Sequence, residues 1–181
     1  MADQLIVLEE VTGRLESAKI RYMITSSIAF NYYAVPRMTR DIDILVDISI
    51  EDAERKFSVF EKDFYIDMDA VRNAVMNLSM FNIINYENPV KVDFIVLKRD
   101  EYERLKFSRK HRRKINGFKV YIISPEDLII SKLMWAKDSI SEIQIRDVSN
   151  LISCVKTLDL KYLGFWIKKL ELKELYEMAL K

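Results

Sequence analysis

The chain has 181 residues, of which 50% are hydrophobic and 31% charged, a balance typical of a soluble folded protein. Its 29 basic and 28 acidic side chains leave a net charge of +1, which excludes a global field attracting nucleic acid or an anionic membrane. The single cysteine, Cys154, excludes an internal disulfide, and we expect a buried free thiol in a reducing compartment. Neither an apolar run of roughly 18 residues nor a signal-peptide pattern is present, so we expect a cytoplasmic protein with no membrane partner.

Helical and extended patterns alternate along the first half of the chain. Its expected elements are a helix over residues 3–18, a strand over 20–25, a short helix over 27–34 ending before Pro36, a strand over 41–48, and helices over 51–62 and 69–77. This alternation indicates a mixed α/β fold in a single compact unit.

The second half begins extended and ends helical. Its expected elements are strands over 78–85 and 90–97, a helix over 100–107, a basic segment over 108–115, a turn at Asn116-Gly117, a strand over 118–123, and helices over 125–137, 140–157, 160–169 and 171–180. We therefore expect an α/β (α+β) fold, in which a mixed β-sheet flanked by helices (residues 1–123) is followed by a C-terminal helical region (124–181) packed on this core.

Carboxylates interrupt two strands that are otherwise apolar. Asp41 and Asp43 lie two residues apart, so both side chains point to one face of their strand. Asp93 stands in the apolar run KVDFIVL, where a buried carboxylate needs a positive partner. If the two strands are neighbours, three carboxylates converge, and oxygen-only ligands of this kind favour Mg²⁺ or Mn²⁺. Asp47 shares the face of Asp41 and Asp43, and we expect it at the solvated end of the strand.

Two other interpretations of these features stay open. An Asp-x-Asp pair alone more often lies at a sheet rim and faces water, as IDMDA (66–70) illustrates, since we expect that second pair at a helix N-terminus. Ser26 and Ser27 lie where a strand turns into a helix, so backbone N–H groups there can bind phosphate, or either serine can simply cap the helix.

Taken together, the segments TSSIAFNYYAVPRMTRDIDILV and KVDFIVL resemble the signature of the polymerase-β-type nucleotidyltransferase superfamily. RMTRDIDILV, with SPEDLIISKLMWAK and IRDVSNL downstream, resembles the AbiEii-type branch, which contains toxins of toxin–antitoxin systems. The resemblance covers roughly residues 20–155. It implies a nucleotidyltransferase catalytic core over 1–123. The implied reaction transfers a nucleotidyl group from a nucleoside triphosphate (ATP or another NTP) to an acceptor hydroxyl of RNA or protein and depends on Mg²⁺ or Mn²⁺.

The resemblance also implies roles for individual residues. Asp41, Asp43 and Asp93 would hold the metal ions, and Asp93 would help to deprotonate the acceptor hydroxyl. The nucleotide would be bound at Ser26 and Ser27, with Ser27 touching the triphosphate. Arg37 and Thr39 match a motif beside the site. Ser26 departs from the family, which has glycine there. Glycine lets the backbone approach a phosphate closely, so this departure bears on nucleotide binding and not on the fold.

Lys132 and Asp147 lie on the apolar sides of consecutive expected helices. Two opposite charges on inward faces could form a structural salt bridge. The resemblance implies instead that Lys132 reaches the phosphates and that Asp147 orients Lys132 or the acceptor. Upstream, Ser124 and Pro125 form a helix start, with Ser124 as N-cap.

The segment KFSRKHRRKI (106–115) carries six Lys and Arg residues and the single histidine, His111. It is either a solvated hairpin strand or, if it flanks the carboxylates, a track for an RNA backbone. We expect a nucleotidyltransferase, and the AbiEii-type resemblance adds a toxin role with a cognate antitoxin. Loss of glycine at Ser26 keeps an alternative open, in which a catalytically weakened copy of the fold senses nucleotides or binds a partner.

Overall fold

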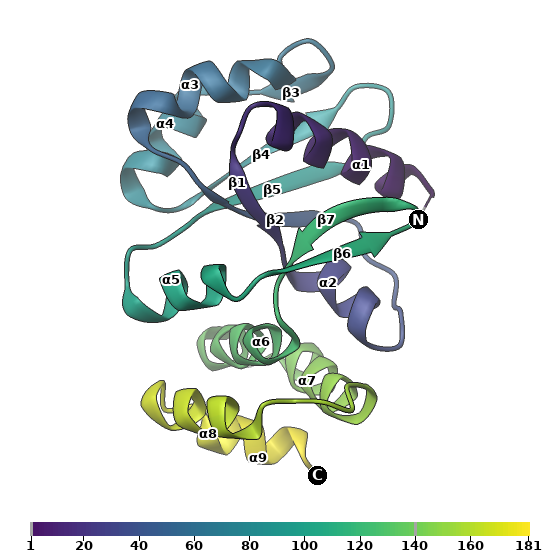
Figure 1. Ribbon diagram of the computed structural model, residues 1–181, viewed down its shortest axis with the longest axis vertical. Coiled ribbons are helices and arrows are strands. Elements are labelled where there is room, and N and C mark those ends of the chain that lie inside the picture. Colours follow the sequence, from purple (N-terminus) through teal and green to yellow (C-terminus); the bar gives the residue numbers. More distant parts are fainter. Residues whose placement is uncertain (1, 140) are drawn as a thin grey trace.

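The computed structural model describes residues 2–139 and 141–181 (Figure 1). The helices are α1 (Ala2–Ser17), α2 (Ser26–Tyr33), α3 (Ile50–Phe57), the 3-10 helix η1 (Ser58–Phe60), α4 (Met68–Asn77), α5 (Glu101–Ser108), α6 (Pro125–Ser139), α7 (Glu142–Cys154), α8 (Leu160–Lys169) and α9 (Lys173–Ala179). The strands are β1 (Arg21–Ile24), β2 (Ile42–Asp47), β3 (Phe64–Ile66), β4 (Met80–Asn85), β5 (Lys91–Val96), β6 (His111–Ile115) and β7 (Phe118–Ile122). Within this part of the chain no helix has the length and apolar character needed to cross a bilayer.

The mixed α/β fold expected from the sequence is confirmed, with three differences in detail. Strand β3 was not expected, because three residues are too few to display an alternating pattern. The helix expected over 51–62 ends at Phe57 and continues only as the single turn η1. The start of the helix expected over 140–157 falls on residue 140, outside the described residues, and α7 itself ends at Cys154.

The strands form one mixed sheet in the order β3-β4-β5-β2-β1-β7-β6. Strand β2 pairs with β5 in parallel and with β1 in antiparallel orientation. Strand β1 pairs with β7 in parallel at Ile24 and Ile122, and the β6–β7 hairpin closes this side of the sheet. The C-terminal end of β1 and the N-terminal ends of β2 and β5 therefore lie at the same end of the sheet, where the candidate site is found.

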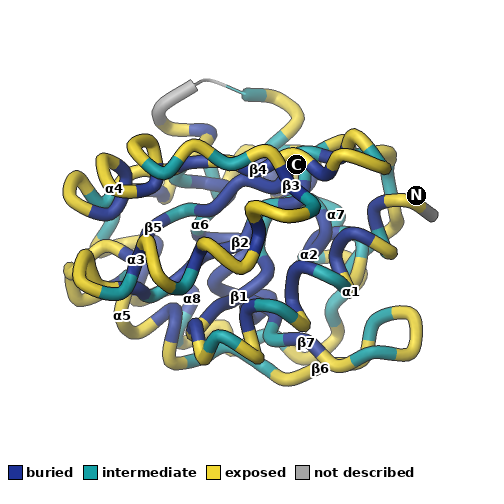
Figure 2. The backbone as a smooth tube through the Cα atoms, turned by 90° about the horizontal axis from the view of Figure 1, so that it is seen from above, coloured by how far each residue is buried: buried dark blue, intermediate teal, exposed yellow. Residues whose placement is uncertain are grey.

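One face of the sheet is covered by an aromatic core. Phe57 of α3 packs edge-on against Phe81 of β4 and Phe94 of β5, and Phe60 of η1 extends the cluster. The register puts Asn82 of β4 opposite Asp93 on the other face, where alternate residues of β4 are exposed. The exposure of this face is therefore limited to β4, whereas β5 is buried or half-buried along its whole length (Figure 2).

The C-terminal helices α6–α9 gather beyond the end of the sheet, below α2 and α5 in Figure 1. The fully buried Asp127 of α6 joins them to the rest of the protein. It accepts hydrogen bonds from the Ser124 hydroxyl (2.7 Å), from Arg109 Nε (3.1 Å) and from the Tyr162 hydroxyl of α8 (2.6 Å). The backbone N–H of Asp127 in turn donates to Ser124 Oγ, which confirms Ser124 as the N-cap.

Cys154 is exposed, so the expectation of a buried thiol is wrong. Cys154 is the last residue of α7, and the buried stripe of that helix ends one turn earlier, at Leu151.

Candidate active site

The centre of the candidate site is a pair of carboxylates on neighbouring parallel strands. Asp43 of β2 lies directly opposite Asp93 of β5, so the strands are neighbours, as the expected convergence required. The side chain of Asp93 is only 7% exposed, and its Oδ1 atom is buried without a hydrogen-bond partner. A buried carboxylate oxygen in this state is costly unless a cation or a donor approaches it.

Asp41 lies at the edge of the site, just before β2, with its side chain 48% exposed. It is linked to Asp93 through Lys91, whose Nζ atom is 2.8 Å from Asp93 Oδ2 and 3.8 Å from Asp41 Oδ2. The hydrogen bond to Asp93 raises the pKa of Lys91, so this amine stays charged. The positive partner that the sequence required beside Asp93 is therefore Lys91.

The electrostatic environment disfavours the ionised form of Asp43. Burial raises its pKa from 3.8 to about 6, and the charges of Asp93 and Asp41 add to this effect. A hydrogen bond with the Ser26 side chain acts in the opposite direction and lowers the pKa. The fold therefore keeps the Asp43 carboxylate buried and close to like charges at a free-energy cost, which a bound cation would offset.

The chemistry of this set fits a hard divalent cation. All donors are carboxylate oxygens, one of them lacks a partner, and the ammonium of Lys91 already lies between Asp41 and Asp93. The carboxylates do not form a finished coordination shell, since no group of three acidic, histidine or cysteine side chains among the described residues is close enough to hold a metal ion. Asp41 lies outside the strand, and the Lys91 amine bridges it to Asp93.

The turn from β1 into α2 lies beside the carboxylates. The backbone N–H of Thr25 donates to the carbonyl of Asp43 (3.0 Å), which fixes the start of α2 against β2. Ser26 has φ of 54°, in the left-handed region that glycine adopts without steric cost. The serine thus keeps the backbone conformation expected of the family's glycine and adds a hydroxyl directed to Asp43. Thr25, not either serine, is the N-cap, and its side chain forms no capping bond.

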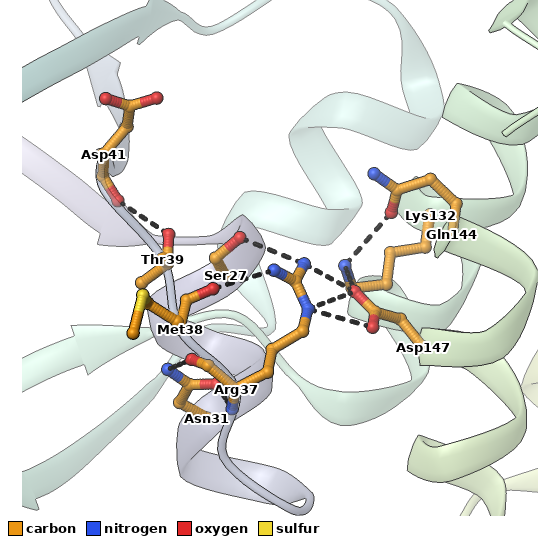
Figure 3. Close-up of polar contacts among 9 residues, drawn as sticks. All are labelled: Ser27, Asn31, Arg37, Met38, Thr39, Asp41, Lys132, Gln144 and Asp147. Atoms are coloured by element: carbon orange, nitrogen blue, oxygen red, sulfur yellow. Dashed lines mark hydrogen bonds and ion pairs between the residues drawn. The ribbon is translucent and has the colours of Figure 1, made fainter. Parts of the chain in front are cut away.

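A second cluster surrounds Asp147, whose side chain is 1% exposed (Figure 3). Lys132 Nζ donates to Asp147 Oδ2 at 2.7 Å, so the two inward charges of consecutive helices do pair. Arg37 adds a second cation, with Nη2 2.8 Å from Asp147 Oδ2, and the same Nη2 donates to Ser27 Oγ at 3.3 Å. Gln144 accepts from Lys132 at 3.1 Å. The cluster connects the C-terminal helices to the start of α2.

This second cluster contains one more positive charge than negative charge. Burial would raise the pKa of Asp147, but hydrogen bonds from Arg37 and Lys132 outweigh it and hold the pKa below its ordinary value. Burial lowers the pKa of Lys132, and its bond to Asp147 opposes this shift. With two cations facing one carboxylate beside Ser27, the cluster can accept an anion at its exposed edge, where the Arg37 side chain is 31% accessible.

Thr39 lies between the two clusters in the loop that precedes β2. Its hydroxyl donates to the carbonyl of Asp41 at 3.4 Å, and its own carbonyl accepts from Gln4 of α1 at 2.9 Å. Figure 3 places the Asp41 carboxylate away from the Arg37 cluster, on the other side of Thr39. Thr39 therefore shapes this loop through backbone contacts.

Asp47 is not the solvated end of its strand, and that expectation is wrong. Its side chain is 9% exposed and forms ion pairs with Arg21 and with Arg99, the latter at 3.3 Å. These arginines come from β1 and from the loop after β5, so the ion pairs link these segments to β2 at the end of the sheet opposite the candidate site.

Sequence reasoning missed three residues of the site. Lys91 carried a signal, because it lies two residues before Asp93 and so shares its face of β5. Asn82 could be found only from the pairing of β4 with β5, which aligns it with Asp93. Gln144 lies one helical turn before Asp147, which could have indicated a common partner in Lys132.

The sequence matches a known protein family over most of its length. A family model described as "Nucleotidyl transferase of unknown function (DUF2204)" matches residues 4–172. No curated protein matches the chain significantly.

Among solved structures, an antigenic nucleotidyltransferase-like protein from Paracoccidioides brasiliensis superposes with a TM-score of 0.58 at 18% identity, covering 96% of this chain and 91% of that protein. The antibiotic-resistance factor ANT(2'')-Ia gives a TM-score of 0.59 at 13% identity, with 94% and 95% covered. The lincosamide antibiotic adenylyltransferase LnuA, solved with lincomycin bound, gives 0.55 at 13% identity, with 85% and 97% covered. At these identities the likeness concerns the fold.

Proposed function

Because the chain belongs to this family of nucleotidyl transferases, we propose that it is a metal-dependent enzyme that uses a nucleoside triphosphate. It transfers the nucleotidyl group to an acceptor hydroxyl and releases pyrophosphate. The observation that carries this proposal is the register of Asp43 against Asp93, with one Asp93 oxygen buried and without a partner. A fold that only binds partners gains nothing from this costly arrangement.

Asp41, Asp43 and Asp93 are the residues that would hold Mg²⁺ or Mn²⁺. The bound ions would lower the pKa of the attacking hydroxyl and neutralise charge on the triphosphate and the leaving pyrophosphate. Asp93, the most buried of the three carboxylates, accepts the proton of the acceptor hydroxyl. In the metal-free site the ammonium of Lys91 offsets part of the negative charge of the carboxylates. When a metal ion takes over that role, Lys91 is free to pair with phosphate oxygens.

The triphosphate binds at the start of α2, where Ser26 and Ser27 present backbone N–H groups and Ser27 its hydroxyl. Arg37 and Lys132 supply the positive charge that this anion needs, since a single carboxylate faces them. Asp147 acts as a positioning residue, because both of its oxygens are already taken by these two cations. Thr39 positions the loop that carries Asp41.

The acceptor is an RNA 3′ end or a protein side chain. The segments RMTRDIDILV, SPEDLIISKLMWAK and IRDVSNL resemble the AbiEii-type branch, and this resemblance supports a role as a cytoplasmic toxin paired with an antitoxin. Residues 1–123 form the catalytic core, and residues 124–181 form a helical region that supplies Lys132 and Asp147. Because LnuA was solved with lincomycin bound, a small-molecule hydroxyl is the acceptor to exclude first.

A second candidate function is a nucleotide-sensing or partner-binding module with weak turnover. Ser26 motivates it, since a serine at φ 54° carries strain that glycine would avoid. The hydroxyl of Ser26 argues against it, because its contact with Asp43 favours the ionised carboxylate that metal binding needs.

The deciding experiment incubates the purified protein and Mg²⁺ or Mn²⁺ with each of the four α-phosphate-labelled triphosphates and with total RNA, protein extract or lincomycin. We expect label in the RNA or protein fraction and none with Asp43→Asn. Triphosphate binding by calorimetry without transfer would favour the nucleotide-sensing module. Absence of both binding and transfer would exclude the enzyme and favour the partner-binding form of the module.

A further inference from the structure

Strand β6 forms the outer edge of the sheet and carries three consecutive cations, Arg112, Arg113 and Lys114, all exposed. The hairpin register sets Lys119 of β7 directly opposite Lys114. None of the four side chains forms an ion pair with a carboxylate of the described residues, although the adjacent Arg109 is paired with both Glu126 and Asp127. The hairpin, at the margin of the molecule in Figure 2, therefore carries uncompensated positive charge.

This charge exceeds what protection of an edge strand requires. A lysine, a proline or a bulge is enough to prevent edge-to-edge pairing of sheets. Like charges at directly opposed positions, such as Lys114 and Lys119, destabilise the hairpin. Since the protein tolerates this cost in its free state, an anionic partner that removes the repulsion is the physical explanation.

The hairpin is also connected to the candidate site by the strand register. His111 at the start of β6 pairs with Ile122, Ile122 pairs with Ile24, and Ile24 pairs with Ile44. The start of β6 thus lies at the same end of the sheet as Asp43, three strand spacings away, or about 15 Å. A chain of a few nucleotides covers such a distance.

The arrangement of the positive charges on the hairpin indicates which kind of anionic partner it binds. Arg112 and Lys114 lie two residues apart on one face of the extended strand β6, with Lys119 of β7 opposite Lys114. Cations in this arrangement suit an extended polyanion better than a single phosphate. The Arg112 guanidinium lies 5.7 Å from the ring centroid of Tyr121, which keeps it at the surface. A membrane is disfavoured, because membrane-binding surfaces combine cations with exposed apolar residues, and no large hydrophobic residue of the hairpin is exposed.

We propose that the β6–β7 hairpin binds the phosphate backbone of single-stranded RNA, so that the RNA end reaches the carboxylates as the acceptor. The acceptor role rests on the proposed function, whereas binding to the hairpin requires no catalysis. The two can therefore fail separately.

The test measures fluorescence anisotropy of a labelled single-stranded RNA of about 16 nucleotides over a series of salt concentrations. The variant Arg112→Gln/Lys114→Gln/Lys119→Gln should bind at least about tenfold more weakly at low salt. Three lost phosphate contacts should reduce the slope of log K against log salt by about 2. The charge-matched control Lys156→Gln/Lys161→Gln/Lys168→Gln, which changes exposed residues of the C-terminal region, should retain both values.

The triple hairpin variant should melt no lower than the wild type, because the substitutions remove repulsion, and its thermal melting verifies that it is folded. Lack of RNA binding by the wild type, equal binding by the hairpin variant, or equal competition by polyglutamate would overturn the inference. Transfer of label to RNA that is unaffected by the hairpin variant would also refute it while leaving the proposed function intact. RNA binding without any transfer would refute only the acceptor role.

Discussion

Asp43→Asn should make the metal-free protein more stable above pH 6 while abolishing its response to metal. The pKa of Asp43 in the folded protein is about 6, against 3.8 for the ordinary group. The folded state therefore holds the proton more tightly than the unfolded chain between about pH 4 and pH 6, and the free energy of unfolding falls as the pH rises through this window. Asparagine cannot ionise, so the free energy of unfolding of the variant does not fall through this pH window on account of residue 43.

The size of the effect follows from the shift. Two pKa units at about 1.4 kcal/mol each give about 3 kcal/mol as an upper bound. Roughly 2–4 °C per kcal/mol for a protein of this size converts it to a melting temperature roughly 6–12 °C above that of the wild type. The difference between the two proteins should be present at pH 8 and should disappear by pH 4.

The assay is thermal unfolding of both proteins from pH 4 to pH 8 in chelated buffer, repeated at neutral pH with Mn²⁺. Metal should raise the melting temperature of the wild type and leave that of the variant unchanged. If Asp43→Asn lowers the melting temperature at pH 8 without metal, the carboxylate is a structural group and the reasoning from its burial and from like-charge repulsion fails.

Three further outcomes are expected. Lys91→Met should tighten Mn²⁺ binding several-fold in calorimetry, because it removes a cation that competes for Asp93; weaker binding would mean that the ammonium supports the metal site. Asp147→Asn should destabilise the protein by about 3–5 kcal/mol in denaturant unfolding, since it leaves buried cations without their carboxylate; a loss below about 1 kcal/mol would contradict the burial of this charge. Tyr162→Phe should cost about 1.5–3 kcal/mol, because Asp127 loses a hydroxyl donor; its Mn²⁺ affinity should equal that of the wild type, and a change there would mean that the C-terminal helices shape the carboxylate site.

The strands that carry the site could be predicted because their residues alternate or run continuously apolar. DIDILVDI and KVDFIVL each contain an entire strand, and the buried charge in the second pointed to a cationic partner. The pairing of Asp43 with Asp93 could be predicted only conditionally, because periodicity within a strand carries no information about which strand lies beside it.

Contacts made by loops and by long side chains could not be predicted. Arg37 follows Pro36 in an irregular segment, so no pattern indicated that it would reach Asp147. Asp47 was misjudged for a related reason, since its partners Arg21 and Arg99 come from a different strand and a loop. Long side chains reach partners that are set by the tertiary fold alone.

The parallel pairing of β2 with β5 affects the order in which the chain folds. Asp43 and Asp93 meet only across this pairing, and the two strands are separated in sequence by α3, η1, β3, α4 and β4. Parallel contacts between distant segments form slowly, because the closure of a long loop must precede any gain from pairing. A partly folded chain on the ribosome can therefore contain helix α1 and the β1–α2 turn without yet having its carboxylate pair. Any chemistry of this site begins only when the slowest contacts of the fold have formed.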